Sequence, residues 1–430
     1  MTDSNLIRAG VAQKKITPAL GSNLGGYPYR RVAKTVRSDL YARAMVFDDG
    51  RKKVAVVSTD LVAVTAEIVE PAKATIERQC GIDPGAVMIC ATHTHTGPEI
   101  RYRRDLDFGP DPQYNADLSR NIAAAVEEAC GAMFDAGLYL GETEAAGYTF
   151  NKIWRTRDGN DVYHNPGGAE RPEDLLGPAG PLDTSVQVLA VRDGTKRLRG
   201  MMVNFAAHPN SKGDDIWAEW PGETARCIAA VYGDDVPCLV LQGTSGDNDC
   251  IKSLRRENVG KGIAGAAMMA IERAENPPPN PPVVDFRCEI LPIPYCIRTP
   301  ELNAAMEALR KRDDLKPLER AGLRMYDTWD KDGKTASVPV QCLRVGDAAF
   351  VALPAEVFAA LGLEIKRYSP AKKTFVATCA NEKFGYVPPA DQAHRGAYGE
   401  KPAQARQLVA EAGRMMVDSA VKSLHQMWNR

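Results

Sequence analysis

The sequence predicts an α/β protein, and two observations carry that prediction. Short apolar runs typical of buried strands alternate along most of the chain with longer runs that have helical spacing. Most of the apolar runs also end abruptly in polar residues, as strands do at the edge of an open α/β sheet. The 430 residues are 44% hydrophobic and 25% charged, which are ordinary values for a globular protein. We expect one domain that covers residues 1–430.

The alternation is clearest in the first part of the chain. Residues 54–60 (VAVVSTD) and 86–90 (AVMIC) predict buried strands. Each run precedes a helical pattern, at residues 66–79 and at the alanine-rich residues 115–134. Further strand-like runs follow at residues 200–209, 236–247, 348–356 and 374–382.

Other segments interrupt or close this pattern. Residues 150–185 are rich in Gly, Pro and charge, and we expect a long excursion with little regular structure there. Residues 276–282 (NPPPNPP) predict a stiff connection inside the single domain. Residues 301–315 and the C-terminal residues 405–428 have the spacing of amphipathic helices.

Composition excludes some classes of partner. The 54 basic and 55 acidic residues leave a formal net charge of −1, and no long basic run suggests a nucleic-acid partner. The ten cysteines form no C-x-x-C pair, so we expect them to be reduced. The first residues lack the pattern of a signal peptide, and no apolar stretch is long enough to span a bilayer. These features predict a cytoplasmic protein without membrane insertion.

Histidines follow two of the predicted strands. His93 and His95 come just after residues 86–90, and alternate side chains of a strand share a face, so we expect both rings to point the same way. His208 ends another apolar run, and Glu356 ends a third and opens a helical pattern. The strand-end residues that could carry chemistry are Asp60, His93, His95, His208, Asp247, Glu356 and Asn381.

This set contains the ligands of a hydrolytic zinc site. Such a site has three protein ligands drawn from His, Glu, Asp and Cys, and His93, His208 and Glu356 supply two imidazoles and a carboxylate. Imidazoles also titrate near neutrality and suit acid/base catalysis. Plainer explanations remain open: chance clustering of histidines, and stabilisation of a helix N-terminus by Glu356. The aspartates and asparagine are common turn formers.

Four motifs occur in the same order as in a known family. They are THTHTGP (92–98), NFAAHP (204–209), LPAE (353–356) and GYV (385–387), preceded by AGVAQKKITP (9–18). In these motifs the chain resembles the catalytic domain of the neutral/alkaline ceramidase family over nearly its whole length. The segments FNKIW, GPAGPLD and GDNDC make it most similar to short bacterial relatives. The resemblance implies a ceramidase-like fold with central mixed β-sheets flanked by helices.

The resemblance also implies a metal site. One zinc ion per chain would be held by His93, His208, Glu356 and Tyr386, while His95 would face the substrate and stabilise or protonate it. Zinc lowers the pKa of bound water towards neutrality and polarises a carbonyl, so metal-activated water could hydrolyse an amide at pH 7. Tyr386 would help to hold the metal or the developing oxyanion, although the sequence alone equally allows a packed aromatic residue.

The chain departs from the family at two positions. Where ceramidases have a serine assigned to catalysis, in a GDVSP-like segment, this chain has Asp249. We therefore expect direct attack by metal-activated water, with Asp247 or Asp249 as a base or as a partner of a ligand. The family's basic residue after the asparagine of its NR segment is Lys152 here, which keeps the charge but not the bidentate fork.

A further difference concerns the substrate. Lipid ceramidases carry an additional immunoglobulin-like C-terminal domain, whereas this chain ends soon after the zinc motifs. We therefore expect a small, soluble, polar substrate with an N-acyl or other amide bond. Arg101, Arg103 and Arg104 follow the histidine pair closely and, with residues 150–185, are candidates to bind its polar part.

The leading hypothesis is a zinc-dependent hydrolase of an amide (C–N) bond in a small molecule. An esterase or lactonase is an alternative, since the same polarised carbonyl serves either leaving group. A non-catalytic metal- or ligand-binding protein, or a metal-assisted isomerase or lyase acting on a sugar-like substrate, also fits these residues. No pattern in the sequence predicts an oligomeric state.

Overall fold

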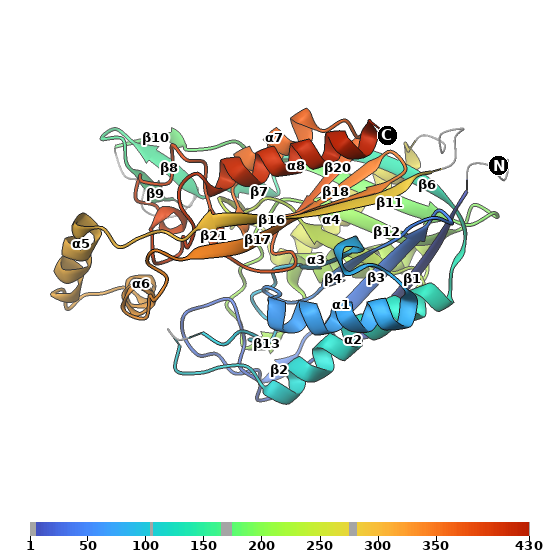
Figure 1. Cartoon of the computed structure of the whole chain (residues 1–430). Coiled ribbons are helices and arrows are strands. Elements are labelled where there is room, and N and C mark those ends of the chain that lie inside the picture. Colours follow the sequence, from blue (N-terminus) through green and yellow to red (C-terminus); the bar gives the residue numbers. More distant parts are fainter. Residues whose placement is uncertain (1–5, 104–105, 165–173, 275–281, 430) are drawn as a thin grey trace.

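The chain folds around two mixed β-sheets that contact each other, with helices on the outside (Figure 1). This computed structural model describes residues 6–103, 106–164, 174–274 and 282–429. The predicted α/β class, with central mixed β-sheets flanked by helices, is confirmed.

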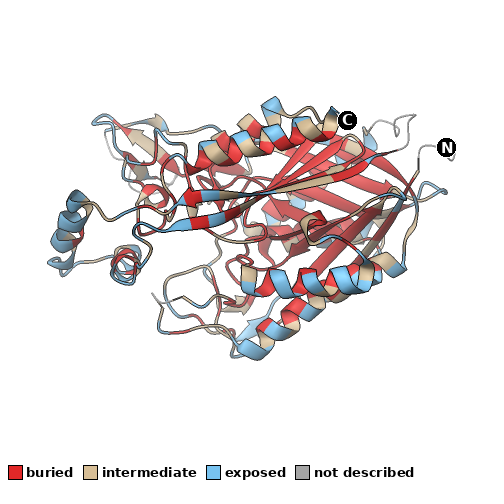
Figure 2. Ribbon diagram, in the orientation of Figure 1, coloured by how far each residue is buried: buried red, intermediate tan, exposed pale blue. Residues whose placement is uncertain are grey.

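The larger sheet has eight strands, parallel in the pair at each edge and antiparallel between them. Across the sheet they are β14 (Cys238–Gln242), β12 (Leu198–Phe205), β11 (Ser185–Arg192), β6 (Phe134–Glu144), β1 (Ile7–Lys15), β3 (Tyr41–Asp48), β4 (Lys53–Thr59) and β5 (Val87–Ala91). Strands β4, β5 and β14 are buried along nearly their whole length, as Figure 2 shows for the sheet interior. Their continuous apolar runs are typical of strands covered on both faces.

The smaller sheet has four strands and packs against β12 and β14. In order they are β16 (Val284–Pro294), β17 (Thr335–Val345), β18 (Ala348–Ala352) and β20 (Lys373–Ala377). A buried amide joins the two sheets: Nδ2 of Asn204 donates to the carbonyl oxygens of Leu241 in β14 (3.0 Å) and Val376 in β20 (3.1 Å). The two sheets therefore share one interior, and their relative position is fixed by polar as well as apolar contacts.

Helices cover the outer faces of both sheets. Helix α2 packs on β1 and β3, with α1 against α2. Helices α3 and α4 pack beside β14 and β11, and α7 and α8 pack on the smaller sheet, while α5 and α6 project at one end (Figure 1). The helices are α1 (Ala66–Cys80), α2 (Pro112–Gly131), α3 (Glu219–Tyr232), α4 (Arg256–Glu272), α5 (Pro300–Arg310), α6 (Pro317–Asp327), α7 (Ala359–Tyr368) and α8 (Ala412–Trp428), with 3₁₀ turns η2 (Pro84–Ala86) and η3 (Tyr398–Glu400).

Short strands form four small sheets around one end of the larger elements. They pair as β2 (Thr35–Val36) with β13 (Asp215–Ile216), β7 (Thr149–Asn151) with β15 (Asn248–Cys250), β19 (Glu356–Val357) with β21 (Tyr386–Val387), and β8 (Ile153–Thr156) with β9 (Asp161–Tyr163) and β10 (Leu175–Pro178). The expectation of little regular structure at 150–185 is therefore wrong where the structure describes it. Short polar strands that pair with each other lack the apolar periodicity that predicts a strand. Residues 165–173 of that excursion, and 276–281 of the proline-rich connection, lie outside the described residues.

The C-terminal helix is shorter than its sequence pattern. It begins at Ala412 rather than near residue 405. The backbone before it is already used by other segments, since the N–H of Tyr386 donates to the carbonyl oxygen of Ala405 and the N–H of Cys296 to that of Gln407. These tertiary hydrogen bonds replace the helical ones that the spacing predicted.

Two further sequence expectations concern bonds and membranes. All ten cysteines are free of disulfide bonds in the described chain, and several are buried in strands. Among the described helices, none combines the length and the apolar character needed to cross a bilayer.

Candidate metal centre and its pocket

The paired histidines lie in the loop after β5. Since β5 ends at Ala91, strand alternation was the wrong reason to expect their convergence. His93 instead has a left-handed backbone with φ of 67°, an uncommon conformation for a non-glycine residue. The convergence itself is present, because the Nε2 atoms of His93 and His95 lie 3.4 Å apart.

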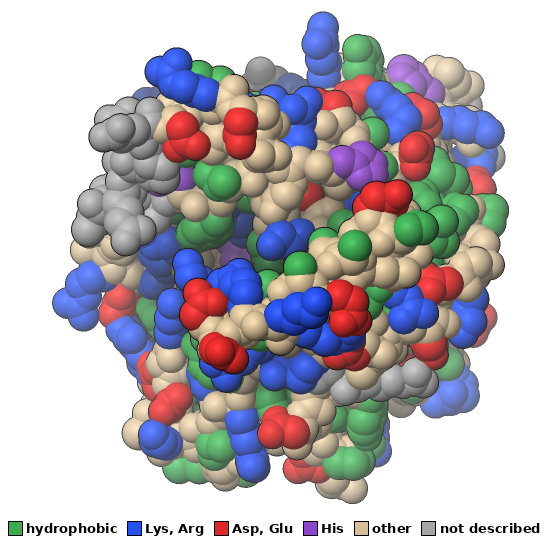
Figure 3. Space-filling model, turned by 90° about the vertical axis from the view of Figure 1, so that its left-hand side faces the viewer, with side chains coloured by type: hydrophobic (Ala, Val, Ile, Leu, Met, Phe, Trp, Pro, Cys, Tyr) green, Lys and Arg blue, Asp and Glu red, His purple; other side chains and the backbone are tan. Residues whose placement is uncertain are grey.

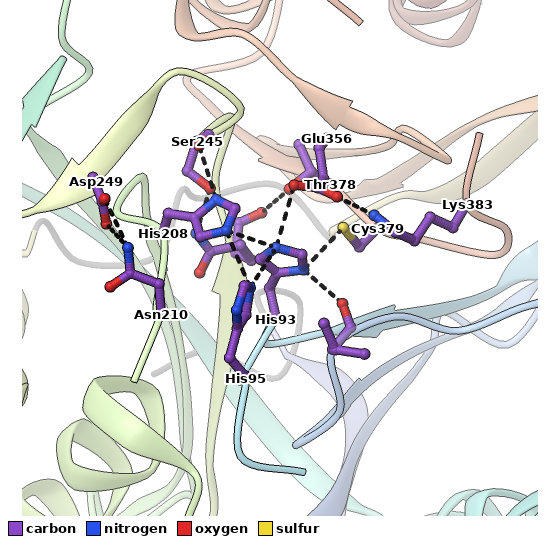
Figure 4. Close-up of polar contacts among 12 residues, drawn as sticks. His93, His95, His208, Asn210, Ser245, Asp249, Glu356, Thr378, Cys379 and Lys383 are labelled. Atoms are coloured by element: carbon purple, nitrogen blue, oxygen red, sulfur yellow. Dashed lines mark hydrogen bonds and ion pairs between the residues drawn. The ribbon is translucent and has the colours of Figure 1, made fainter. Parts of the chain in front are cut away.

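A third imidazole and a carboxylate reach the same point from other segments (Figure 4). His208 follows β12, and its Nε2 lies 3.1 Å from that of His93 and 3.2 Å from that of His95. Glu356 comes from β19, and its Oε2 lies 3.4 Å from Nε2 of His93. All four side chains are buried. Three distant stretches of the chain therefore bring four donor atoms together.

The spacing of these atoms fits a metal ion. Four tetrahedral ligands held about 2.0–2.1 Å from zinc lie about 3.3 Å from one another. The nitrogen–nitrogen separations of 3.1, 3.2 and 3.4 Å agree with that value. Oε2 of Glu356 is buried and accepts no hydrogen bond from any described residue, and a cation would satisfy it. The three histidines thus form a group that could hold a metal ion.

Backbone carbonyls orient two of the three rings. Nδ1 of His93 lies 2.6 Å from the carbonyl oxygen of Val62, and Nδ1 of His208 lies 3.3 Å from that of Ser245. A proton on Nδ1 leaves Nε2 as the metal-binding atom. Nδ1 of His95 is buried and has no hydrogen-bond partner among the described residues. Metal-bound histidines almost always have such a partner, so His93 and His208 fit as ligands better than His95 does.

The electrostatics of the cluster favour a cation. Burial lowers the pKa of His95 and of His208 well below the usual value, so both rings are neutral at pH 7. Burial also lowers the pKa of His93, but Cys379 and Glu356 outweigh it and raise that pKa to about 9. The cluster therefore attracts positive charge, which a metal ion can supply in place of a proton.

Glu356 lies in a short strand and not at the start of a helix. Helix α7 begins only at Ala359, with Phe358 as its N-cap, so the interpretation of Glu356 as a helix cap is wrong. Nζ of Lys383 forms an ion pair with its Oε1. Burial alone would raise the pKa of Glu356, but Lys383 and His93 outweigh burial and hold it well below the usual value. Glu356 is therefore an anion at neutral pH.

Tyr386 and Lys152 lie beside this group. Tyr386 is the register partner of Glu356 in the β19–β21 pair, and burial and the charge of Glu356 raise its pKa well above the usual value. Its phenol therefore keeps its proton and can donate a hydrogen bond. Nζ of Lys152 lies 3.4 Å from Nδ1 of His208 and 5.7 Å from the centre of the Tyr386 ring. Burial lowers the pKa of Lys152.

The two candidate aspartates bind neighbouring loops. Asp247 accepts a hydrogen bond of 2.8 Å from Nδ2 of Asn151, and burial raises its pKa to about 6. Asp249 accepts one of 2.7 Å from Asn210 and forms an ion pair of 2.7 Å with Lys252. Asp249 also lines the pocket described below. These contacts tie both carboxylates to neighbouring segments of the chain.

The predicted arginine cluster is only partly placed. Arg101 lines the pocket, and its guanidinium lies 2.6 Å from the buried carboxylate of Glu99. Arg103 lines the pocket as well, while Arg104 lies outside the described residues.

The remaining strand-end residues serve the fold. Asp60 forms a buried ion pair with Arg43 at 2.8 Å. The amide of Asn381 joins β5 to β17, accepting from the N–H of Ile89 and donating to Gln341. Neither residue lines the pocket.

Two contributors to the site were missed from the sequence. Lys383, which compensates Glu356, stands three residues before Tyr386, and its place beside the GYV motif was the only available signal. Glu219 is fully buried at the start of α3 with a positive φ of 52°. Its carboxylate accepts hydrogen bonds from the backbone N–H groups of His95 (2.7 Å) and Ser211 (2.9 Å). It thereby ties the two histidine loops together, and no sequence pattern marked it.

The donor cluster opens into a pocket of about 1180 Å³. That volume is at the upper end of known small-molecule sites, which run to roughly 1,000 Å³. Lys and Arg side chains gather around a hollow on the face drawn in Figure 3. The wall includes His93, His95, His208, Glu356, Tyr386 and Lys152, so a bound molecule reaches the donor atoms directly.

Fold and site together define the class of protein: an α/β protein of ceramidase fold, with a buried cluster of histidines and a carboxylate at the base of a pocket. The solved structure of a neutral ceramidase from Pseudomonas aeruginosa matches with a TM-score of 0.74 and 17% identity, over 97% of this chain and 74% of that chain. A ceramidase complexed with C2 matches with a TM-score of 0.72 and 16% identity, over 99% of this chain and 76% of that chain. The ceramidase-like fold that the motifs implied is confirmed. No protein-family model and no curated protein matches the sequence.

Proposed function

We propose that this protein is a metal-dependent hydrolase that cleaves an amide bond in a small molecule, with zinc as its metal. The convergence of three imidazole nitrogens and a carboxylate oxygen at the base of the pocket carries this proposal. Nitrogen and carboxylate donors at near-tetrahedral spacing suit zinc. The two similar solved structures are ceramidases, a name that denotes hydrolysis of the amide bond of ceramide.

His93, His208 and Glu356 hold the metal in this proposal, with Tyr386 beside them as the fourth residue. When bound, a zinc ion supplies Lewis acidity to a carbonyl oxygen and lowers the pKa of water. Glu356 brings the negative charge, and the carbonyls behind His93 and His208 keep their Nε2 atoms aimed at the ion. Lys383 holds the carboxylate in place from its other oxygen.

His95 is the acid/base residue in this proposal. Its ring is neutral, and its Nδ1 is not committed to a backbone carbonyl as those of the other two histidines are. It can accept a proton as water attacks and return that proton to the leaving nitrogen. The protonated phenol of Tyr386 donates a hydrogen bond to the carbonyl oxygen as negative charge develops there. Lys152 adds positive charge nearby, and Asp247 and Asp249 hold the surrounding loops.

Metal analysis of purified variants tests the ligand assignment. We expect one zinc ion per chain in the wild type and its loss in His93→Ala and His208→Ala. His425→Ala, at an exposed position on α8, is the matched control and should keep the metal. His95→Ala should keep most of the metal yet lose amide hydrolysis. Unchanged metal content in His93→Ala and His208→Ala would refute these two ligands.

Turnover of matched substrates tests the reaction itself. An amide and an ester with the same acyl group should both be presented to the zinc-loaded protein. Amide cleavage that disappears in His95→Ala supports the proposal. Cleavage of the ester alone would instead identify an esterase, and zinc binding without hydrolysis of either compound would identify a metal-binding protein.

A further inference from the structure

We propose that the substrate is an anionic N-acyl compound whose negative group binds a basic wall formed by Lys212, Lys252 and Arg256. This inference rests on the proposed hydrolase function and names its substrate class. All three residues line the pocket into which the metal-binding cluster opens. They are distinct from the arginines that follow the histidine pair in the sequence.

The basic wall is built from the same segments that position His208. Lys212 lies four residues after His208 on one loop. Lys252 follows β15, which pairs with β7, and Arg256 is the first residue of α4. An anion held on this wall would therefore lie in the same pocket as the donor atoms.

One carboxylate cannot neutralise this wall. Asp249 accepts the 2.7 Å contact from Lys252, and its oxygens are shared with Asn210 (2.7 Å), the hydroxyl of Tyr163 (3.2 Å) and the N–H of Cys250 (3.0 Å). Its charge is thus already satisfied by Lys252 and three neutral groups.

Arg256 and Lys212 keep their positive charge unbalanced. Arg256 donates only to neutral acceptors, namely Oδ1 of Asn210 (2.8 Å) and the carbonyl oxygen of Ile251 (3.2 Å). Its Nε is buried and has no hydrogen-bond partner within the described ranges. Lys212 makes no ion pair with any residue that the structure describes. Of these three cations only Lys252 forms an ion pair among the described residues, so Arg256 and Lys212 remain available to an anionic ligand.

Another part of the pocket lining is apolar. It is formed by Leu318 and Met325 of α6 together with Trp329, and Leu318 is 48% exposed while Trp329 is buried. Apolar side chains in a pocket wall are suited to an acyl chain. A molecule with an apolar acyl group, an amide and an anionic group therefore matches the three kinds of lining that the pocket offers.

Matched substrates separate charge from shape. The zinc-loaded full chain should be given N-lauroylglycine and N-lauroylisobutylamine. The second compound has a neutral isopropyl group of similar size in place of the carboxylate. N-lauroylaminomethylphosphonate tests whether a phosphonate serves as well as a carboxylate. We expect the anionic amides to have a kcat/KM at least about tenfold higher than the neutral amide. A higher kcat/KM for the carboxylate or for the phosphonate shows which of these two anionic groups the basic wall prefers.

Variants of the wall locate the effect. Lys212→Gln should raise KM for N-lauroylglycine about tenfold and leave kcat and turnover of the neutral amide nearly unchanged, and Arg256→Gln should also raise that KM. Lys212→Arg should restore most of the affinity. Lys261→Gln is the matched control, since this exposed lysine lies on α4 outside the pocket. Equal turnover of anionic and neutral amides, or unchanged KM in both variants, would overturn the inference and leave the hydrolase proposal standing.

A binding measurement keeps the two proposals apart. If no amide is cleaved, calorimetry still measures the affinity of the zinc-loaded protein for N-lauroylglycine, and so tests whether the basic wall binds an anion. Salt-sensitive binding that weakens in Lys212→Gln but not in Lys261→Gln would support the anion site while the hydrolase proposal fails. An affinity that changes neither with salt concentration nor in Lys212→Gln would overturn the inference.

Discussion

The two sheets of this protein contribute different chemistry to one site. The first half, residues 6–274 around the larger sheet, supplies three imidazole nitrogen donors: His93, His95 and His208. The second half, residues 282–429 around the smaller sheet, supplies the charges, Glu356 and Lys383. Each half alone is incomplete, because the first half contributes no anion to the cluster and the buried carboxylate of the second half needs compensation.

The halves also hold their groups in different ways. In the first half, loops after strands are fixed by backbone carbonyls and by the carboxylate of Glu219. In the second half, paired short strands present Glu356 and Tyr386 in register. A metal ion at their meeting point would act as a cross-link, so variants on either side should differ in predictable ways.

The largest effect is expected from Glu356→Gln, which removes the anion and leaves Lys383 buried without its partner. Breaking a buried ion pair costs about 3–5 kcal/mol, and we expect the free energy of unfolding to fall by that amount. Urea denaturation measures it. Adding Lys383→Met should recover most of the stability but not metal binding. Unchanged stability in the single variant would mean that this charge pair does not stabilise the second half.

Metal removal should have the next largest effect. An ion present at about 100 times its Kd stabilises the folded state by about 2.7 kcal/mol. We therefore expect a lower Tm after chelation of the wild type, measured by calorimetry. His208→Ala should show no response to the chelator, whereas His425→Ala should respond as the wild type does. An unchanged Tm of the wild type after chelation would contradict the presence of a cross-linking ion.

A second meeting point of the halves carries like charges. Burial, reinforced by Asp161 of β9, raises the pKa of Glu400 in η3 from 4.5 to about 7. Because the folded pKa lies above the unfolded one, the stabilising contribution of Glu400 is complete below pH 4.5 and is lost as pH rises through 7. We expect Glu400→Gln to match the wild type at pH 4.5 and to exceed its stability by about 2 kcal/mol at pH 8. If the curves of Tm against pH for the wild type and for Glu400→Gln are parallel, Glu400 does not destabilise the fold at high pH and the prediction is wrong.

The smallest effect is expected within the first half. Glu219→Gln keeps one acceptor for the loops of His95 and Ser211 and replaces the other by an NH2 group, which cannot accept a hydrogen bond, at a cost of about 1 kcal/mol. Misplaced ligands should raise the Kd for zinc about tenfold, measured by competition with a chromophoric chelator. Glu223→Gln, on the same helix and ion-paired with Arg226, is the control that should leave the Kd unchanged. Equal Kd values would assign Glu219 a purely structural role.

Much of the fold could be predicted because its strands and helices have strong local patterns. The buried runs of β4 and β5 and the alanine-rich helix α2 follow from apolar spacing. The strands at 150–185 could not, because they are short, polar and pair mainly with one another. The late start of α8 could not either, because it depends on hydrogen bonds to distant segments. The candidate ligands were predicted from residue type and motif order, and their assignment stays a prediction.

The sequence by itself determined which residue types stand at the strand ends, since histidine and glutamate offer donor atoms that few other side chains provide. Only the tertiary structure decided the rest: the positive φ that aims His93, the carbonyl of Val62 behind it, and the lysine at 383 that balances Glu356. Those features depend on distances between atoms far apart in the chain. Local propensity holds no record of such distances, because they are fixed only when the loops around each sheet assemble in three dimensions.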